Sequence, residues 1–468
     1  MFETIRNAFK IKDVRKKILM TILFVFLFRI GCYITVPGLN DISSQLAESS
    51  ANGMNIFGLL NSITGSALSQ GTLFSLGISP YINASIIVQL LTVAIPALER
   101  MSKEGDEGRE KINKITRWVT LALAILSAVG IYLTLKNQYN YVNPAWLGGS
   151  GTVFYDFFNT TAGEWVMGIY VCAVLVGGSM LCMWIGERIT EYGVSNGISM
   201  LIFVGIVATA AQQFISTLFS NKGQNWYLAL IFLVTLIVVF GFIVWVDGAE
   251  RKIKVQYAKQ VKGNKMYGGQ STFIPIKVNA SGVMPLIFAY ALLSFPTMII
   301  STFVTKQGPG TFYNWWMDYM TASTGNWVGT VVYNVALGIL IFVFAYFYSQ
   351  IQFNPVEISR NIQNNGGFVT GIRPGRETAE YLAKVVSRIT LWGAIFLAII
   401  AFVPSILFSI PGWIPGVNTA SQLVNSFSAT GMLICVSVAL EFNKALENQI
   451  LMRHYKGLLG SNSKGFLR

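Results

Sequence analysis

Residues able to carry out chemistry are few in this chain. It has one histidine, His454, and no GxxxxGKS or GxxxxGKT loop to hold the phosphates of a nucleotide. The four cysteines lie in apolar stretches without the spacing of metal ligands, so we interpret them as small hydrophobic residues: Cys32, Cys172, Cys182 and Cys435. The sequence therefore predicts a protein that is not an enzyme and that uses no metal or cofactor.

Ionisable side chains inside apolar stretches are the usual sign of ion-coupled transport. Only Arg29 lies well inside such a stretch, and Glu441 lies near the end of another. Arg29 is either functional, or it pairs with a carbonyl group or extends its side chain toward the membrane surface. An ion-coupled pump would need more buried charge than this.

The elements that must position these residues are long apolar helices. The chain is 53% hydrophobic and only 12% charged, whereas soluble domains carry about 25% charged residues. Runs of about 20 apolar residues recur, which is the length a helix needs to cross a ~30 Å hydrocarbon core. We expect an all-α membrane protein with ten spans, at about 18–36, 76–98, 116–135, 165–185, 198–218, 226–246, 281–304, 328–350, 385–406 and 421–442.

The distribution of lysine and arginine predicts how these spans are oriented. Of the 34 basic residues, thirty fall in the termini and loops on one side of the membrane. Only Lys136, Lys222 and Lys306 fall on the other side. Because cytoplasmic loops are enriched in Lys and Arg, both termini are expected in the cytoplasm.

Ten spans divide into two halves of five, residues 1–218 and 219–468. An odd number of spans in each half means that the halves insert with opposite orientations. Inverted repeats of this kind often place a transport pathway at their interface. The prediction of two inverted halves rests on the count of spans alone.

Two spans are unusually polar or rich in proline. The second, "GISPYINASIIVQLLTVAIP" (77–96), contains Asn83 and Gln89, and the seventh, "NASGVMPLIFAYALLSFP" (279–296), contains two prolines. Polar side chains here either hold neighbouring helices together or line a watery path. Their occurrence in the second span of each half favours a functional role.

The stretch "SITGSALSQGTLFSLG" (62–77) precedes the second span on the external side. It has no charge and consists mostly of small and polar residues, so it is too polar to cross a bilayer. It is either a loosely packed external loop or a segment with a specific packed position among the spans.

Two cytoplasmic loops are also distinctive. Residues 247–279 carry seven basic and two acidic residues, and residues 351–388 include "NNGGFVTGIRPGRE" (364–377). Such loops either set the topology and contact anionic lipid, or dock a negatively charged partner such as a ribosome or an acidic protein surface.

Seven motifs together carry a resemblance to a known family. The chain resembles the SecY family of bacterial protein-conducting channels along essentially its whole length. The matching stretches are "FRIGCYITVPG" (28–38), "GISPYINASIIVQLLTV" (77–93), "KEGDEGREKINKITR" (103–117), "SNGISMLIF" (195–203), "QSTFIPIKVN" (270–279), "FNPVEISRNI" (353–362) and "GIRPG" (371–375).

The resemblance implies a pore between the two halves, closed by a ring of aliphatic side chains that acts as a gasket. It also implies a lateral gate, formed by the second and third spans against the seventh and eighth. The ring residues would be Ile78, Ile82, Ile202, Ile287 and Ile434, and the gate residues Asn83, Gln89 and Phe295.

Residues 62–77 would then be the plug, a short helix that caps the ring from outside. Intermediate polarity suits a segment that must sit against apolar side chains and also move into water. Small residues would fit a narrow funnel, while two leucines would contact the ring. The expected plug residues are Gly65, Ser66, Ala67, Leu68, Gly71 and Leu73.

The resemblance also implies partners and a location. Lys259, Lys265 and Arg373 would dock the SecA motor ATPase or the translating ribosome. SecE and SecG would be the accompanying membrane subunits. Signal sequences and nascent or unfolded polypeptides would be the substrates, released across the bacterial plasma membrane or sideways into the lipid bilayer. Two alternative functions, a secondary transporter for a small solute and a membrane scaffold without a pore, fit the sequence less well.

Overall fold

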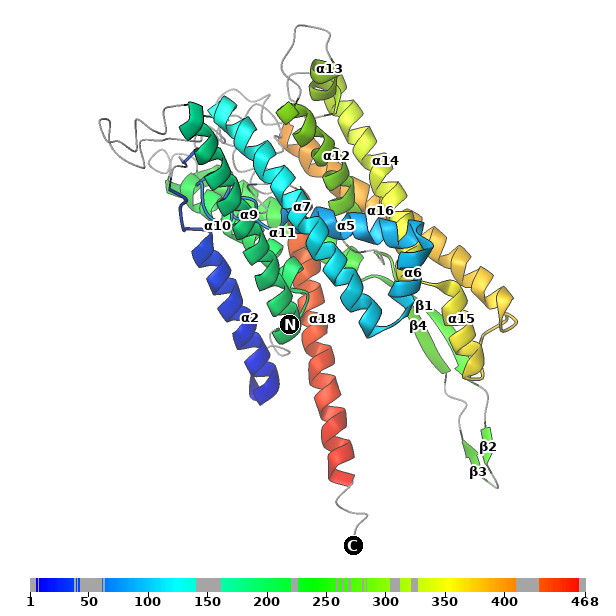
Figure 1. The fold of residues 1–468 in the computed structure, drawn as a ribbon. Coiled ribbons are helices and arrows are strands. Elements are labelled where there is room, and N and C mark those ends of the chain that lie inside the picture. Colours follow the sequence, from blue (N-terminus) through cyan, green and yellow to red (C-terminus); the bar gives the residue numbers. More distant parts are fainter. Residues whose placement is uncertain are drawn as a thin grey trace.

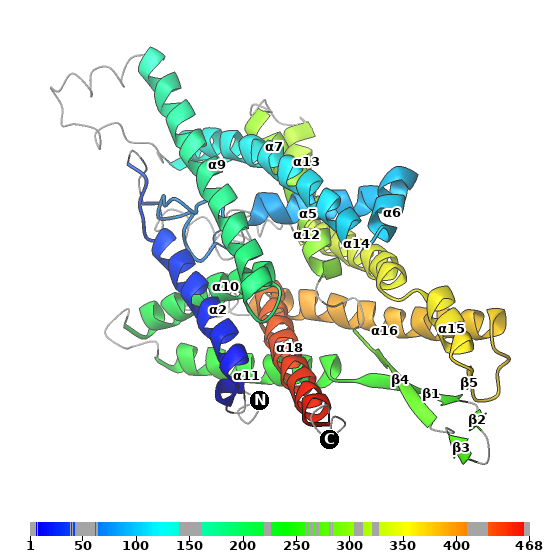
Figure 2. The same cartoon turned by 60° about the horizontal axis from the view of Figure 1, so that its bottom comes forward.

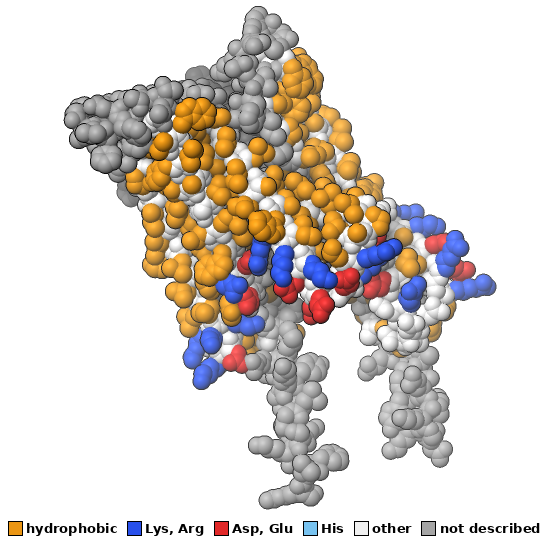
Figure 3. All heavy atoms as spheres, in the orientation of Figure 1, with side chains coloured by type: hydrophobic (Ala, Val, Ile, Leu, Met, Phe, Trp, Pro, Cys, Tyr) orange, Lys and Arg blue, Asp and Glu red, His pale blue; other side chains and the backbone are white. Residues whose placement is uncertain are grey.

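Helices dominate the computed structural model of the chain (Figure 1). The structure describes residues 8–37, 64–139, 161–219, 226–257, 260–262, 265–267, 271–279, 284–303, 312–320, 327–409 and 429–462, and positions 6, 39, 41, 42, 61 and 282. On the face shown in Figure 3, hydrophobic side chains cover the helical part, and charged side chains gather along its lower border. This separation is what a helical protein in lipid requires, since charge is costly in the hydrocarbon core.

Each of the ten predicted spans overlaps a helix. These helices are α2 (Lys12–Gly31), α5 (Ser79–Ala94), α7 (Asp106–Tyr139), α9 (Thr161–Tyr192), α10 (Gly197–Phe219), α11 (Trp226–Asp247), α12 (Met284–Phe303), α14 (Trp327–Gln352), α16 (Arg376–Ser409) and α18 (Ala429–Asn462). Among the described residues, four helices are long and apolar enough to cross a membrane, or five if one bent pair counts as a single span. The number of ten membrane spans therefore stays a prediction.

The bent pair corrects the bounds of the second predicted span. Helix α5 ends at Ala94, and α6 (Pro96–Lys103) continues at an angle of 101° to it. Ile95 between them has extended backbone angles, φ −106° and ψ 114°. Proline disfavours a helical conformation in the residue before it and cannot donate a backbone hydrogen bond, so Pro96 ends α5 and begins α6.

A small sheet lies at the charged end of the molecule and was not predicted. Strands β1 (Glu250–Tyr257), β4 (Ser271–Lys277) and β5 (Gly367–Val369) pair antiparallel in the order β4-β1-β5. A separate hairpin consists of β2 (Gln260–Lys262) and β3 (Lys265–Tyr267). Figures 1 and 2 show the sheet beside α15 (Pro355–Asn364), with the hairpin extending beyond it.

The sheet joins the two basic loops, predicted to be cytoplasmic, that the sequence analysis treated separately. Strands β1 and β4 come from the loop at 247–279, and β5 comes from the loop at 351–388. Their inner face packs on α15 and α16 through a buried cluster that includes Val255, Val369 and Leu382. The two loops therefore form one body with its own core.

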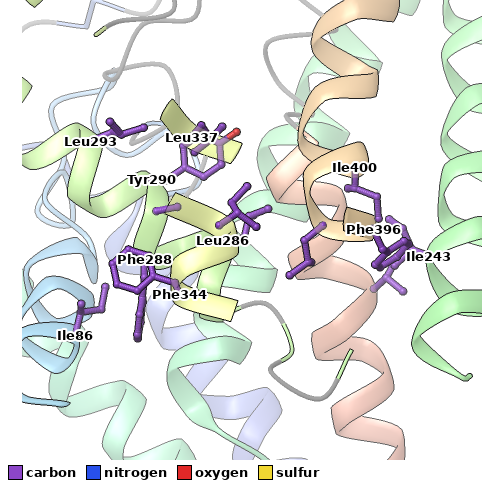
Figure 4. Close-up of a cluster of buried hydrophobic side chains, with 14 of the residues drawn as sticks. Ile86, Ile243, Leu286, Phe288, Tyr290, Leu293, Leu337, Phe344, Phe396 and Ile400 are labelled. Carbon is purple, nitrogen blue, oxygen red and sulfur yellow. The ribbon is translucent and has the colours of Figure 1, made fainter. Parts of the chain in front are cut away.

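The largest hydrophobic cluster joins α5 to helices from the second half of the chain (Figure 4). Ile86 of α5 belongs to the same cluster as Phe288 of α12 and Phe344 of α14. The rings of Phe288 and Phe344 meet edge to face, with centroids 5.7 Å apart. A further short helix, α13 (Phe312–Tyr319), precedes α14.

Candidate functional site

Residues 64–77, the described part of the predicted plug and here named the plug segment, do not form a helix. They form a series of turns instead. Four positions have positive φ: Gly65 (72°), Ser66 (69°), Gly71 (61°) and Gly77 (54°). A right-handed helix needs negative φ at every residue, so these positions exclude the predicted plug helix within this range.

Hydroxyl groups of the plug segment add hydrogen bonds to carbonyl groups that also accept from backbone N–H groups. Ser69 Oγ donates to the carbonyl of Ser66 (3.0 Å), and Thr72 Oγ1 donates to that of Ala67 (3.1 Å). Ser75 Oγ lies 3.0 Å from the carbonyl oxygen of Ala67 and 2.6 Å from that of Thr72. Because buried polar groups must be paired, the serine and threonine content of the segment suits a buried, non-helical structure.

Asn61 organises the start of the plug segment and was missed by the sequence analysis. Its side-chain oxygen accepts a hydrogen bond from the backbone N–H of Ser69 (2.9 Å). Its carbonyl oxygen accepts from Thr64 Oγ1 (3.1 Å) and from the N–H of Ser66 (2.9 Å). An asparagine just before a run of small residues is typical of turns and was an available signal.

The plug segment is tightly seated rather than loosely packed. The N–H of Leu73 donates to Ile34 O (2.9 Å), the N–H of Val36 to Gly71 O (2.9 Å), and the N–H of Ile42 to Ser69 O (2.8 Å). The rings of Phe28 and Phe74 are stacked with centroids 5.7 Å apart. All residues from 64 to 77 except 70 and 73 are buried.

The predicted plug residues fall in two neighbouring clusters. Ala67 and Leu73 lie with Ile78, the residue just before α5, in a cluster that also includes Leu201. Leu68 lies instead in a cluster formed mainly by α7 and α9. Leu73 therefore lies where contact with the ring was expected, and Leu68 packs elsewhere.

Four of the five predicted ring residues meet in one cluster. Ile202 of α10 and Ile434 of α18 are 5% and 6% exposed, and Ile82 of α5 and Ile287 of α12 pack against them. These four residues are named the ring cluster below. Ile78 belongs instead to the cluster that contains Ala67 and Leu73 of the plug segment. Ile82 packs against both that cluster and the ring cluster, so the ring cluster lies directly against the plug segment.

The predicted gate residue Gln89 connects α5 to α14. Tyr348 donates from its hydroxyl group to Gln89 Oε1 (3.3 Å), and Gln89 Nε2 donates to Ser85 Oγ (3.3 Å). The Tyr348 ring packs edge to face on Phe288 of α12, with centroids 5.5 Å apart. Sequence analysis missed Tyr348, although a polar aromatic residue inside an apolar span was an available signal.

The other two predicted gate residues are less fully described. Asn83 lies half-buried on α5, close to Ile82 in sequence. The backbone of Phe295 lies in α12, and its side chain is outside the described part of the structure. The structure therefore does not test the predicted contact between them.

Arg373 is exposed at the tip of a turn that is held from two sides. Gly371 and Gly375 flank it with φ of 85° and 101°. The carbonyl of Arg373 accepts a hydrogen bond from Thr378 Oγ1 (2.7 Å), and the carbonyl of Gly375 accepts one from Ser359 Oγ (2.6 Å). These two hydrogen bonds fix the backbone of the turn, from which the exposed Arg373 side chain extends.

Of the two predicted docking lysines, the structure describes one. Lys265 begins β3, and Lys259 lies outside the described residues. At the far end of β4, partial burial and the neighbouring Lys444 lower the pKa of Lys277, because both disfavour its charged form.

Together these features define a class of protein. It is a helical membrane protein whose helices converge on an aliphatic cluster, with a buried non-helical segment against that cluster and a charged body at one end. Comparisons with known proteins agree with this class. The SecY family model matches residues 72–443.

Relatives and solved structures match along nearly the whole chain. The protein translocase subunit SecY of Corynebacterium glutamicum is 39% identical over 462 residues, covering 97% of this chain and 99% of its own length. A solved protein-conducting channel has a TM-score of 0.62 at 19% identity, covering 93% of this chain and 92% of that chain. Sec61 in a canine ribosome-channel complex has a TM-score of 0.60 at 18% identity, with the same two coverages. The chain belongs to the SecY family, the protein-conducting channel subunits of the translocon.

Proposed function

We propose that the chain is the central subunit of a bacterial Sec translocon, through which unfolded secretory polypeptides cross the plasma membrane. The observation that carries this proposal is the ring cluster, to which α5, α10, α12 and α18 each contribute one isoleucine, next to the buried plug segment. Branched apolar side chains can exclude water and ions from a narrow passage. They make no directional bonds, so polypeptides of many sequences can pass them.

Transport through such a channel is passive and needs an external source of energy. We propose SecA or the translating ribosome as that source, docked on the body that contains β1, β4, β5 and the Arg373 turn. The related Sec61 was solved in a ribosome-channel complex. SecE and SecG are the proposed membrane subunits, and both termini are proposed to lie in the cytoplasm.

The contact between α5 and the pair α12 and α14 is the proposed lateral gate. Residues 1–218 and 219–468 are the two proposed halves, which separate there when a signal sequence binds. Burial of apolar area in lipid stabilises a hydrophobic segment by roughly 25 cal/mol per Å², which drives its exit through the open gate. The Gln89–Tyr348 hydrogen bond and the apolar contacts around it close the gate at rest.

Reconstituted vesicles test the proposed function. The purified chain with SecE and SecG is combined with SecA, ATP and an unfolded precursor protein, and protease-protected precursor is measured. Protection that requires both ATP and a signal sequence is expected. Absence of protected precursor under conditions where a known SecY complex succeeds would contradict the proposal, and uptake of a small solute along an ion gradient would favour a secondary transporter.

A further inference from the structure

Arg29 lies on α2 beside the first residues of the plug segment. We infer that Arg29 is a positioning residue. It holds this end of the plug segment in its closed seat, the buried position in which residues 64–77 close the channel. The inference rests on the proposed function, because it assumes that residues 64–77 close the channel. It assigns a role to Arg29, a half-buried charge within the first predicted span.

Two observations fix the position of the Arg29 guanidinium group. Its Nη2 donates to the Tyr33 hydroxyl (3.1 Å), and its central carbon lies 5.3 Å from the centroid of the Tyr33 ring. A hydrogen bond and a cation–π contact from the same side chain, one turn further along, hold the group in one place. The remaining Nη1 then points to the carbonyl of Gly65, at 3.5 Å.

The backbone at Gly65 passes through a gap that only glycine fits. A Cβ atom there would lie 2.7 Å from Arg29 Nη1 and 3.2 Å from the Cα of Gly205 in α10. Its φ of 72° also favours glycine. The plug segment therefore passes between α2 and α10 next to the guanidinium group of Arg29.

The two ends of the plug segment are attached in different ways. Residues 69–73 bind residues 34–42 by backbone hydrogen bonds, including the Thr35–Thr72 bridge. At the other end, among the described residues, side chains at the end of α2 make the contacts, from Arg29 to Gly65 and from Cys32 Sγ to Thr64 O (3.7 Å). Because a hydrogen bond from a charged donor is stronger than a thiol contact, Arg29 makes the stronger of these two contacts between the end of α2 and the plug segment.

Cys32 provides a native reporter of the closed seat. Its side chain is 2% exposed and lies under Thr64, so a thiol reagent reaches it only after this end of the plug segment has moved. Replacement of Cys172, Cys182 and Cys435 by alanine leaves Cys32 as the single thiol.

The experiment compares Arg29→Met with Arg188→Met in this single-cysteine background, in the complex reconstituted without substrate. Arg188 on α9 is a matched control because it also contacts aromatic rings, those of Trp184 and Tyr192, at 5.9 and 5.7 Å. The rate of Cys32 modification by a membrane-impermeant thiol reagent from the external side is measured, together with resting ion conductance. Arg29→Met is expected to increase both, on the order of tenfold, and Arg188→Met to change neither. Equal, unchanged values for the two variants would overturn the inference.

A second variant and a deletion complete the test. Tyr33 is exposed, so Tyr33→Leu leaves α2 packed while it removes both contacts that orient the guanidinium group. An intermediate increase is expected, and no increase would contradict the inference even if Arg29→Met failed to assemble. Deletion of residues 64–72 is measured in parallel. If the deletion variant conducts ions at rest and the two point variants do not, residues 64–72 close the channel and the proposed role of Arg29 is wrong. If the deletion variant does not conduct ions at rest, the proposal that this segment closes the channel is itself wrong.

Discussion

At the residue scale, small polar side chains decide the conformation of the plug segment. Two consecutive residues, Gly65 and Ser66, have positive φ, so the chain leaves the helical region there. The hydroxyl groups of Ser69, Thr72 and Ser75 then pair the carbonyl groups that remain inside. Alanine at these positions would remove the hydroxyl hydrogen bonds, each worth about 0.5–1.5 kcal/mol, and leave only backbone N–H groups as partners of these carbonyls.

Ser75→Ala tests the contribution of these hydroxyl groups. Loss of the Ser75 hydroxyl removes its hydrogen bonding with Ala67 O and Thr72 O, and destabilises the closed seat by about 1 kcal/mol or more. Resting ion conductance in planar bilayers is expected to rise about fivefold, since about 1.4 kcal/mol is a factor of ten. Ser102→Ala is the control, because that exposed serine makes a similar bond to Glu99 O far from the plug. Equal conductance in both variants would contradict the role of Ser75.

At the element scale, α5 and α14 meet through one polar contact inside a large apolar cluster. Gln89 is the α5 residue in this contact, and Tyr348 approaches it from α14 with its ring against Phe288 of α12. The hydrogen bond adds directional specificity to an interface that is otherwise apolar. Such a contact suits a gate between these helices, because it fixes how they align when closed and one hydrogen bond is weak enough to break on opening.

Tyr348→Phe is expected to make the gate open more readily. It removes the hydroxyl and keeps the ring on Phe288, so the closed state loses about 1 kcal/mol and opening becomes about fivefold more favourable. The fraction of a weakly hydrophobic test segment that enters the bilayer should rise. Tyr346→Phe is the control, since Tyr346 bonds Ser387 O on α16 and not α5. A lower inserted fraction for Tyr348→Phe would contradict the closing role of the hydroxyl.

The charged body at the N-terminal end of α16 exposes Arg373 on a turn that two hydrogen bonds hold in place. Arg373→Glu is expected to abolish motor-driven transport, because a carboxylate repels a negatively charged docking surface. Assembly should be unchanged, as measured by co-purification of the membrane subunits. Arg376→Glu is the matched control, since Arg376 is 92% exposed and pairs within its own helix with Glu380. Near-normal transport by Arg373→Glu would refute the docking role.

At the scale of the whole molecule, three hydrophobic clusters among the described residues join the first and second halves of the sequence. These are the cluster shown in Figure 4, the cluster around the ring isoleucines, and a cluster that contains Val14 of α2, Val194 and Leu446 of α18. The plug segment packs on the ring cluster through Ile78 and Ile82. A change in how the halves meet therefore changes the seat of the plug.

Deletion of residues 64–72 tests this arrangement. The remaining chain keeps the ring cluster and the gate helices, so ATP-dependent transport should continue, while ion conductance without substrate should rise. Conductance and protease-protected precursor are measured on the same preparation. A resting channel that stays as tight as the intact one would show that the ring cluster alone closes the passage.

Much of this architecture could be predicted from the sequence. Runs of apolar residues placed the ten helices, because lipid allows few other structures. The family resemblance identified Ile82, Ile202, Ile287 and Ile434, which the structure does bring together. The excess of basic residues in two loops indicated which surface would carry the charged body.

Other features were decided only by the tertiary structure, because they depend on partners far away in the sequence. The pairing of β1 with β5 needs residues more than a hundred positions apart, so the loop at 351–388 alone does not show that it supplies a third strand. The turns of the plug segment depend on residues 34–42 for their hydrogen bonds. In the same way, an isolated arginine in an apolar helix acquires a defined partner only when Gly65 is brought within reach of it.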